Sequence, residues 1–158
     1  MAGGLLARLL WGRDPERART RIPVPIRRFS TTEPTIGGDI RVDGDAWLID
    51  SMEPRMVRLF EVADPQVDNC LLTYRAALRS QNFSGRVYLE MWCRLPGLGE
   101  FFSRGVKRTL SGTTEWSSFE IPFRLKMGQQ PDLIKLNLGV EGYGKVWIKD
   151  IELLRSSN

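Results

Sequence analysis

From residue 39 onward, short runs of apolar and β-branched residues alternate with polar ones, and clusters of Gly, Pro, Asp and Asn separate the runs. Alternation with a period of two is typical of strands that bury one face, and such regular turn signals are typical of a β-sandwich or barrel. No segment after residue 38 has the period of an amphipathic helix. The pattern predicts an all-β, antiparallel β-sandwich of the jelly-roll type with about nine strands. They cover residues 39–43, 46–50, 56–62, 70–79, 86–94, 106–110, 116–123, 133–141 and 145–154.

The first 38 residues follow a different pattern. Residues 3–11 form a short apolar run interrupted by Arg8, which predicts a short N-terminal helix. Residues 21–38 contain prolines, which fix φ and remove hydrogen-bond donors, so they predict an extended linker or an arm along one edge of the sandwich. The chain therefore divides into a basic N-terminal segment, residues 1–38, and a β-sandwich domain, residues 39–158.

The net charge of +4 is concentrated in that segment. Residues 1–29 hold seven arginines against Asp14 and Glu16, whereas the rest of the chain holds 16 basic and 17 acidic side chains. A nearly neutral domain offers no basic groove, which argues against nucleic-acid binding by the domain. Association with nucleic acid through the arginines of the N-terminal segment is the weaker alternative. Leucines and arginines within residues 3–28 suit peripheral contact with an anionic membrane surface. A disordered or loosely docked terminus is the alternative.

The chain contains two cysteines and no histidine, which excludes a zinc site and a histidine-based catalytic triad. Cys70 and Cys93 lie in apolar alternating runs, so we expect two buried free thiols, with a disulfide between neighbouring strands as the alternative. Free thiols and the lack of a recognisable secretory signal favour a cytoplasmic location.

Alternation also assigns the two faces of each strand. The expected core residues of 70–79 and 86–94 are Leu72, Tyr74, Ala76, Leu78, Val87, Leu89, Met91 and Cys93. The opposite faces carry Arg75 and Arg79 on the first strand, and Tyr88, Glu90 and Trp92 on the second. If the two strands pair as a hairpin across residues 80–85, these five side chains share one exposed surface.

Such a surface is a candidate binding site. Aromatic rings stack on the C–H faces of sugars while charged neighbours meet the hydroxyl groups, and protein interfaces use the same residue types. A carbohydrate ligand, a protein partner and coverage by another part of the chain all remain open. Phe101 and Phe102 are two further candidates, because adjacent phenylalanines in the Gly-rich stretch 95–105, a predicted loop, cannot both point inward from a strand.

Residues 111–116 read Ser-Gly-Thr-Thr-Glu-Trp, and residues 142–153 read Gly-Tyr-Gly-Lys-Val-Trp-Ile-Lys-Asp-Ile-Glu-Leu. These motifs resemble the carbohydrate-binding-module jelly rolls of the galactose-binding-like superfamily. Those domains often have a Gly-Thr-x-x-Trp turn that enters a strand and a last strand ending in Trp/Phe-Ile-Asp-Asp-Ile-x-Leu. The resemblance covers about residues 39–155 and implies a binding module. Lys149 stands where the family has its first acidic residue.

The last motif also makes structural predictions. Gly142 and Gly144 predict a tight hairpin between the last two strands. Ile148 and Ile151 must both be buried although they differ in phase, which predicts a β-bulge near Lys149 and Asp150.

Many modules of this family hold a structural calcium ion. The chain shows no matching set of acidic ligands, and Asp150, Asp64 and Asp68 are the candidates. No other cofactor is expected.

The one feature of the sequence that suggests catalysis is a possible pair of carboxylates, Glu90 and Glu141, because glycoside hydrolysis uses two carboxyl groups. Acidic side chains on strands are usually solvated surface, so we expect a protein that binds without catalysis.

Overall fold

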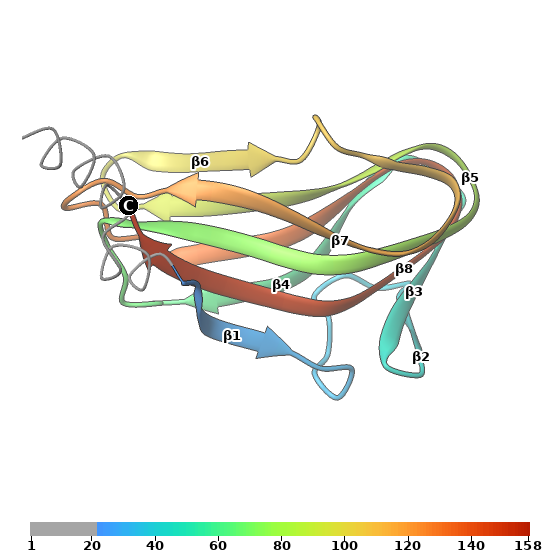
Figure 1. Cartoon of the computed structure of the whole chain (residues 1–158), viewed down its shortest axis with the longest axis horizontal. Coiled ribbons are helices and arrows are strands. Elements are labelled where there is room, and N and C mark those ends of the chain that lie inside the picture. Colours follow the sequence, from blue (N-terminus) through green and yellow to red (C-terminus); the bar gives the residue numbers. More distant parts are fainter. Residues whose placement is uncertain (1–21) are drawn as a thin grey trace, which may run out of the picture.

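The structure is a computed structural model that describes residues 22–158. These residues form eight strands and no helix, and every strand pairing is antiparallel (Figure 1). The strands are β1 (Val24–Phe29), β2 (Arg41–Asp43), β3 (Ala46–Ser51), β4 (Arg55–Ala63), β5 (Cys70–Leu95), β6 (Gly99–Arg104), β7 (Leu110–Arg124) and β8 (Leu133–Ser157). Residues 22–158 thus contain no helix able to cross a membrane. The helix predicted at residues 3–11 lies outside the described residues.

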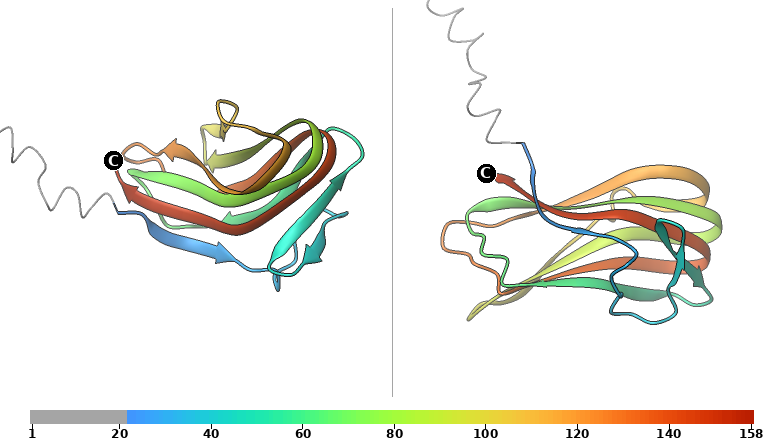
Figure 2. Two further views of the ribbon diagram at one scale, coloured as in Figure 1. Left: turned by 45° about the vertical axis from the view of Figure 1, so that its right-hand side comes forward. Right: turned by 90° about the horizontal axis from the view of Figure 1, so that it is seen from below.

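Strands β5 and β8 organise the molecule. They pair along nearly their full length, from Cys70 opposite Ser157 to Arg94 opposite Leu133. Both bend back at the same end of the molecule, on the right in Figure 1, so each contributes one half to each of two layers (Figure 2). One layer joins β7, the first half of β5 and the second half of β8 to β3 and β1. The other joins β6, the second half of β5, the first half of β8 and β4. The predicted all-β sandwich is confirmed.

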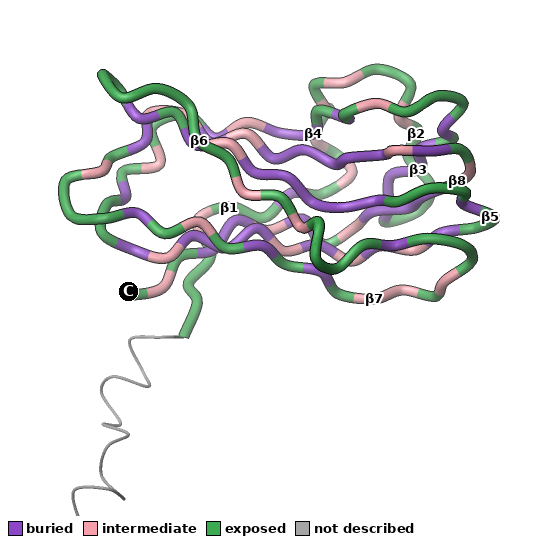
Figure 3. Tube along the Cα trace, turned by 90° about the horizontal axis from the view of Figure 1, so that it is seen from above, coloured by how far each residue is buried: buried purple, intermediate pink, exposed green. Residues whose placement is uncertain are grey.

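The two layers enclose one main hydrophobic core, and Figure 3 shows buried and exposed positions alternating along the strands. All eight core residues predicted for residues 70–79 and 86–94 are buried. Cys70 and Cys93 are buried free thiols, as predicted. Burial raises the pKa of both thiols, that of Cys93 to about 12, which keeps them protonated and unreactive.

The bend depends on close contact between two backbones. Gly85 lies opposite Gly142. A Cβ atom on Gly142 would lie 1.9 Å from the carbonyl oxygen of Ser84, and one on Gly85 would lie 2.1 Å from that of Glu141. Gly85 also has a φ of 121°, which side chains rarely adopt. Only glycine fits at this crossing.

The bend corrects two predictions about pairing. Residues 80–85 and Gly142–Gly144 are not hairpin turns, because the segments on either side of each do not pair with one another. Instead, the first half of β5 pairs with the second half of β8 in one layer, and the second half of β5 pairs with the first half of β8 in the other. Turn-forming glycines look alike in sequence whether they close a hairpin or let a long strand change layer.

Two other segments differ from the predicted strands. The stretch 95–105 is not a loop throughout, because β6 pairs with β5 after a turn in which Leu98 N donates to Leu95 O at 3.0 Å. Residues 106–110 form a turn and enter a strand only at Leu110. Of the glycines that indicated a loop, Gly97 lies in the turn before β6, Gly99 is the first residue of β6 and Gly105 directly follows that strand.

The predicted linker also contributes to the sheet. Strand β1 pairs with the last part of β8, from Val24 opposite Arg155 to Phe29 opposite Ile151, as an edge-following arm does. The predicted bulge is confirmed, since the pairing shifts register between Arg75 and Ala77, and Asp150 has a φ of 53°.

We predict that Gly142→Ala lowers the free energy of unfolding by about 3 kcal/mol, because the new methyl group collides with backbone that cannot move aside. Urea denaturation measures this change. Gly38→Ala is the matched control, since a Cβ there meets nothing within 4 Å. Equal stability of the two variants would contradict the role assigned to the crossing.

Candidate functional site

The outer surface of the layer formed by β4, β5, β6 and β8 carries the candidate site, here called the Trp92 face. It holds a shallow hollow of about 370 Å³. The residues that line this hollow are Met56, Arg58, Glu90, Trp92, Glu100, Arg104, Lys135 and Asn137. Phe102 stands directly opposite Trp92 in the pairing of β5 with β6. An aromatic pair therefore borders a polar hollow on a rigid sheet.

Trp92 and Phe102 form that aromatic pair. Their ring centroids lie 5.0 Å apart and the ring planes are tilted by 42°. Phe102 is 51% exposed, and Trp92 is partly exposed. The Arg104 guanidinium lies 4.3 Å from the Phe102 ring centroid, a cation–π contact. The two rings present apolar surface to solvent beside charged groups.

Glu90 fixes this arrangement from below. Its side chain is 2% exposed, yet its carboxylate accepts hydrogen bonds from three donors. Trp92 Nε1 donates at 2.6 Å, Arg104 Nε at 2.6 Å and Asn137 Nδ2 at 3.0 Å. Charge-assisted hydrogen bonds of this kind satisfy a buried carboxylate. Glu90 is therefore a support that orients Trp92, rather than the exposed contact residue predicted from the sequence.

Tyr88 is also a support. Its ring lies flat against Gly139, where a Cβ atom would come within 2.4 Å of the ring. Its hydroxyl donates to Glu141 Oε1 at 2.7 Å, and it is only 3% exposed. Burial and this hydrogen bond raise the pKa of Tyr88 to about 12. Tyr88 is not positioned to stack on a ligand.

Arg75 and Arg79 lie on the opposite face of the molecule. The predicted shared surface is wrong, because residues 70–79 belong to the other layer. Arg75 pairs with Glu120 at 3.0 Å, and the Arg79 guanidinium lies 4.6 Å from the Trp147 ring centroid. The five predicted residues are thus divided between two outer faces.

That opposite face has its own aromatic group, Trp116 and Trp147, which were named from the sequence only within the two family motifs. Trp147 Nε1 donates to Asp43 Oδ2 at 2.8 Å, and Lys149 Nζ lies 4.3 Å from the Trp116 ring centroid. Trp147 is 8% exposed, since it packs with residues of β3. Other side chains of the protein contact both the Trp147 and the Trp116 ring. This face is therefore the weaker candidate for a binding site.

Phe101 and Phe102 are both exposed, but they lie on opposite sides of β6. Phe102 joins the Trp92 face, whereas Phe101 pairs with Cys93, whose side chain points into the core. Because Phe101 is 44% exposed at the rim, it is a surface residue outside the hollow.

The three acidic side chains named as calcium candidates do not lie together. Among the described residues, no group of three or more acidic or cysteine side chains is placed to hold a metal ion. Asp150 borders a hollow with Arg28 and Arg75, whereas Asp64 and Asp68 border a different one. Asp150 therefore lies apart from the other two candidates.

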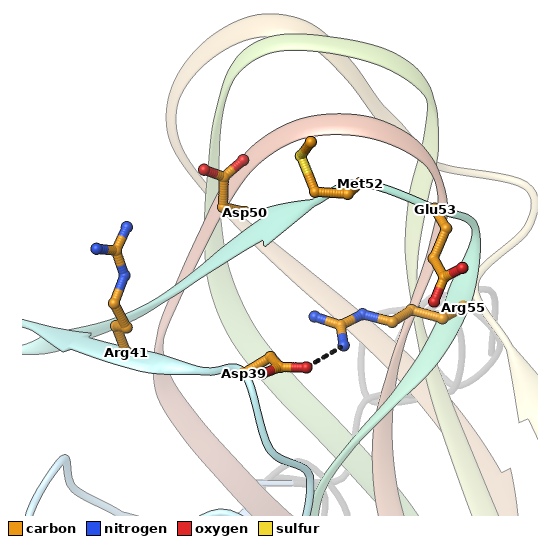
Figure 4. Close-up of a pocket in the computed structure, with 6 residues that line it drawn as sticks. All are labelled: Asp39, Arg41, Asp50, Met52, Glu53 and Arg55. Carbon is orange, nitrogen blue, oxygen red and sulfur yellow. Dashed lines mark ion pairs between the residues drawn. The ribbon is translucent and has the colours of Figure 1, made fainter.

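A wider hollow of about 600 Å³ lies beside β3 and the start of β4. Figure 4 shows Arg55 reaching across it toward Asp39, at 3.7 Å, while Arg41, Asp50 and Met52 stand around it. No aromatic ring lines it, and charges of both signs are mixed there. The Trp92 face offers a better-defined binding chemistry.

The sandwich belongs to a class of folds shared with known binding modules. No protein-family model and no curated protein matches the sequence. Among solved structures, the fold is similar to the CBM22-1 xylan-binding domain of Xyn10C from Paenibacillus barcinonensis, at 12% identity and a TM-score of 0.56, covering 86% of this chain and 97% of that one.

The fold is also similar to the CBM22-1–GH10 modules of the Clostridium thermocellum xylanase 10B complexed with xylohexaose, at 8% identity and a TM-score of 0.57. That match covers 83% of this chain and 28% of the longer one. The predicted resemblance to carbohydrate-binding modules is confirmed at the level of the fold.

We predict that Tyr88→Phe raises the pKa of Glu141. The hydrogen bond from Arg86 and, after it, the one from Tyr88 hold that pKa below its ordinary value. The stabilisation that these bonds give is fully present above the ordinary pKa of a glutamate and is lost as the pH falls through the lowered pKa. NMR titration of the Glu141 carboxyl measures the shift. Tyr143→Phe, at an exposed tyrosine, should leave the midpoint unchanged. An unmoved midpoint in Tyr88→Phe contradicts this explanation.

Proposed function

We propose that this protein is a non-catalytic carbohydrate-binding module that holds a glycan chain on the Trp92 face. One observation carries the proposal: the aromatic pair of exposed Phe102 and partly exposed Trp92, in which the Trp92 indole is held by a buried carboxylate. A pyranose ring can stack its C–H face on such rings. The remaining side chains of the hollow then meet the sugar hydroxyl groups.

The polar groups suit a neutral ligand. Lys135 Nζ is 3.0 Å from Glu100 Oε1, and Arg104 is paired with Glu90, so charges of the hollow are largely balanced within the protein. Paired side chains retain donors and acceptors for hydroxyl groups without demanding a charged ligand. Because Trp92 is already held in place, less conformational entropy is lost on binding.

The absence of catalysis rests on the two carboxylates that first suggested an enzyme. Glu90 is buried and accepts three hydrogen bonds. Glu141 is engaged by Arg86 and by the Tyr88 hydroxyl. Glycoside hydrolysis requires one carboxyl group to donate a proton and the other to act as base or nucleophile at the scissile bond. Both groups have a structural role here.

Xylan is the first ligand to test, because the two similar structures described above, each with a TM-score above 0.5, carry xylan or xylohexaose in their descriptions. We predict that the protein is retarded in native gels containing xylan or a related soluble polysaccharide. Phe102→Ala should weaken this binding at least about tenfold, equivalent to about 1.4 kcal/mol.

Phe101→Ala is the matched control for that experiment. It removes the neighbouring phenylalanine, which is similarly exposed but lies on the other side of β6. It should bind as the wild type does. Equal losses in the two variants, or no retardation by any polysaccharide tested, would refute glycan binding on the Trp92 face.

We further propose that the basic N-terminal segment attaches the module to an anionic membrane surface. Residues 1–21 hold five arginines against Asp14 and Glu16. Each basic residue near such a surface contributes about 1 kcal/mol. The comparison chain should begin at Ile22, because a later start removes β1 from the sheet.

We predict that the intact chain sediments with phosphatidylserine-containing vesicles at low salt and that the chain beginning at Ile22 stays in the supernatant. Added salt should release the intact chain, since the attraction is screened. Equal sedimentation of both chains would contradict the attachment.

A further inference from the structure

The free edge of β6 is the feature that the proposed function leaves unused. Among the described strands, β6 pairs only with β5 and ends its layer. All its residues are exposed except Ser103, which is partly buried. A free strand edge presents unpaired backbone groups, which can pair with another strand.

Two backbone hydrogen bonds show which groups face that edge. Arg94 O accepts from Asp132 N at 3.0 Å on the β8 side, so Arg94 is turned away from β6 and its neighbour Cys93 toward it. Leu89 O accepts from Gly105 N at 2.9 Å on the β6 side, and Leu89 and Cys93, four residues apart on β5, therefore both face β6. Because successive residues alternate in direction, Phe101 and Ser103 face β5. Glu100, Phe102 and Arg104 therefore direct their N–H and C=O groups to the free edge.

This edge lacks a proline, a lysine and a bulge, three of the features that usually prevent strands from pairing. Its register with β5 has no shift, and Gly99–Arg104 contains neither proline nor lysine. By contrast, the edge strand β1 contains Pro25 and a register shift, and β4 has a shift between Arg58 and Phe60. Prolines, lysines and bulges are the common protections of exposed edges.

We propose that two copies of this chain form a dimer by antiparallel pairing of their β6 strands, with Phe102 on the two-fold axis. In this register Phe102 lies opposite the partner's Phe102, and Glu100 lies opposite the partner's Arg104. The three residues that face the edge are those that pair, so each contributes one N–H donor and one C=O acceptor. The Glu100 carboxylate, which also contacts Lys135, and the Arg104 guanidinium, which also contacts Glu90, would lie on the same face of the sheet. The strand is therefore complementary in charge to itself.

The two-fold axis is perpendicular to the sheet, so both Trp92 faces lie on the same side of the dimer. The two Phe102 rings, exposed in the single chain, become neighbours on that side of the dimer. If the proposed function holds, the dimer presents two adjacent platforms to one polysaccharide and gains avidity. Dimer formation itself requires no glycan.

Analytical ultracentrifugation of the full chain without glycan tests the pairing. We expect a concentration-dependent dimer, and we expect Glu100→Lys to raise its Kd at least about tenfold, because like charges then lie opposite each other. Glu115→Lys on β7 makes the same charge change at an exposed glutamate away from β6 and should dimerise as the wild type does. A monomer at every concentration, or equal Kd values for the two variants, overturns the proposal.

Cysteine substitution tests the register. Residues that exchange both hydrogen bonds lie about 5.5 Å apart at Cα, within the range of a disulfide. Under mild oxidation Phe102→Cys should form a covalent dimer, whereas Phe101→Cys should not, since that position lies opposite the partner's Ser103. The wild type controls for the buried native thiols. Equal cross-linking of both variants, or of neither, contradicts this register.

Discussion

The crossing of β5 and β8 at Gly85 and Gly142 is the constraint on which the other features of the structure depend. There the two backbones are too close for any side chain, so the two longest strands can change layer together without losing their pairing. Each layer consequently has half of β5 beside half of β8 at its centre. Which side chains share an outer face follows from this crossing and not from neighbourhood in the sequence.

This dependence explains what could be predicted from the sequence and what could not. Alternation is local, so the inward positions from Leu72 to Cys93 and the bulge beside Asp150 were predicted correctly. Pairing is not local, and the expected hairpin wrongly placed Arg75 with Trp92. The residues around Gly85 are typical of turns, and the same residues occur whether the chain closes a hairpin there or a long strand bends from one layer into the other.

The candidate site shows the same division. Trp92 and Phe102 were identified as surface aromatics, but their contact depends on the register between β5 and β6, which no local pattern reveals. Tyr88 is a residue type common in binding sites, yet it is buried, because Gly139 on the facing strand leaves room for its ring to lie flat. A glycine on the facing strand was the available signal, and it has meaning only when the pairing is known.

Both outer faces contain a tryptophan that donates a hydrogen bond to a carboxylate, but the two rings differ in what covers them. On each, a carboxylate accepts a hydrogen bond from a tryptophan indole N–H: Glu90 from Trp92, and Asp43 from Trp147. On the second face β3 and Arg79 then cover the ring, so the bond contributes to packing. On the first face the neighbour of the indole is Phe102 on an edge strand, with nothing among the described residues beyond it in the sheet.

A buried carboxylate rarely adds net stability, because desolvation offsets much of the gain from pairing. Glu90 therefore makes more sense as a residue that fixes a binding surface than as one that stabilises the fold. Its three donors come from β5, β6 and β8, so it ties the edge strand to the centre of its layer. The same contacts that hold Trp92 in place also hold β6 against its layer, and a regular edge without a register shift is what a second copy of the chain requires. Recognition of a glycan and assembly of a dimer would then depend on one buried group.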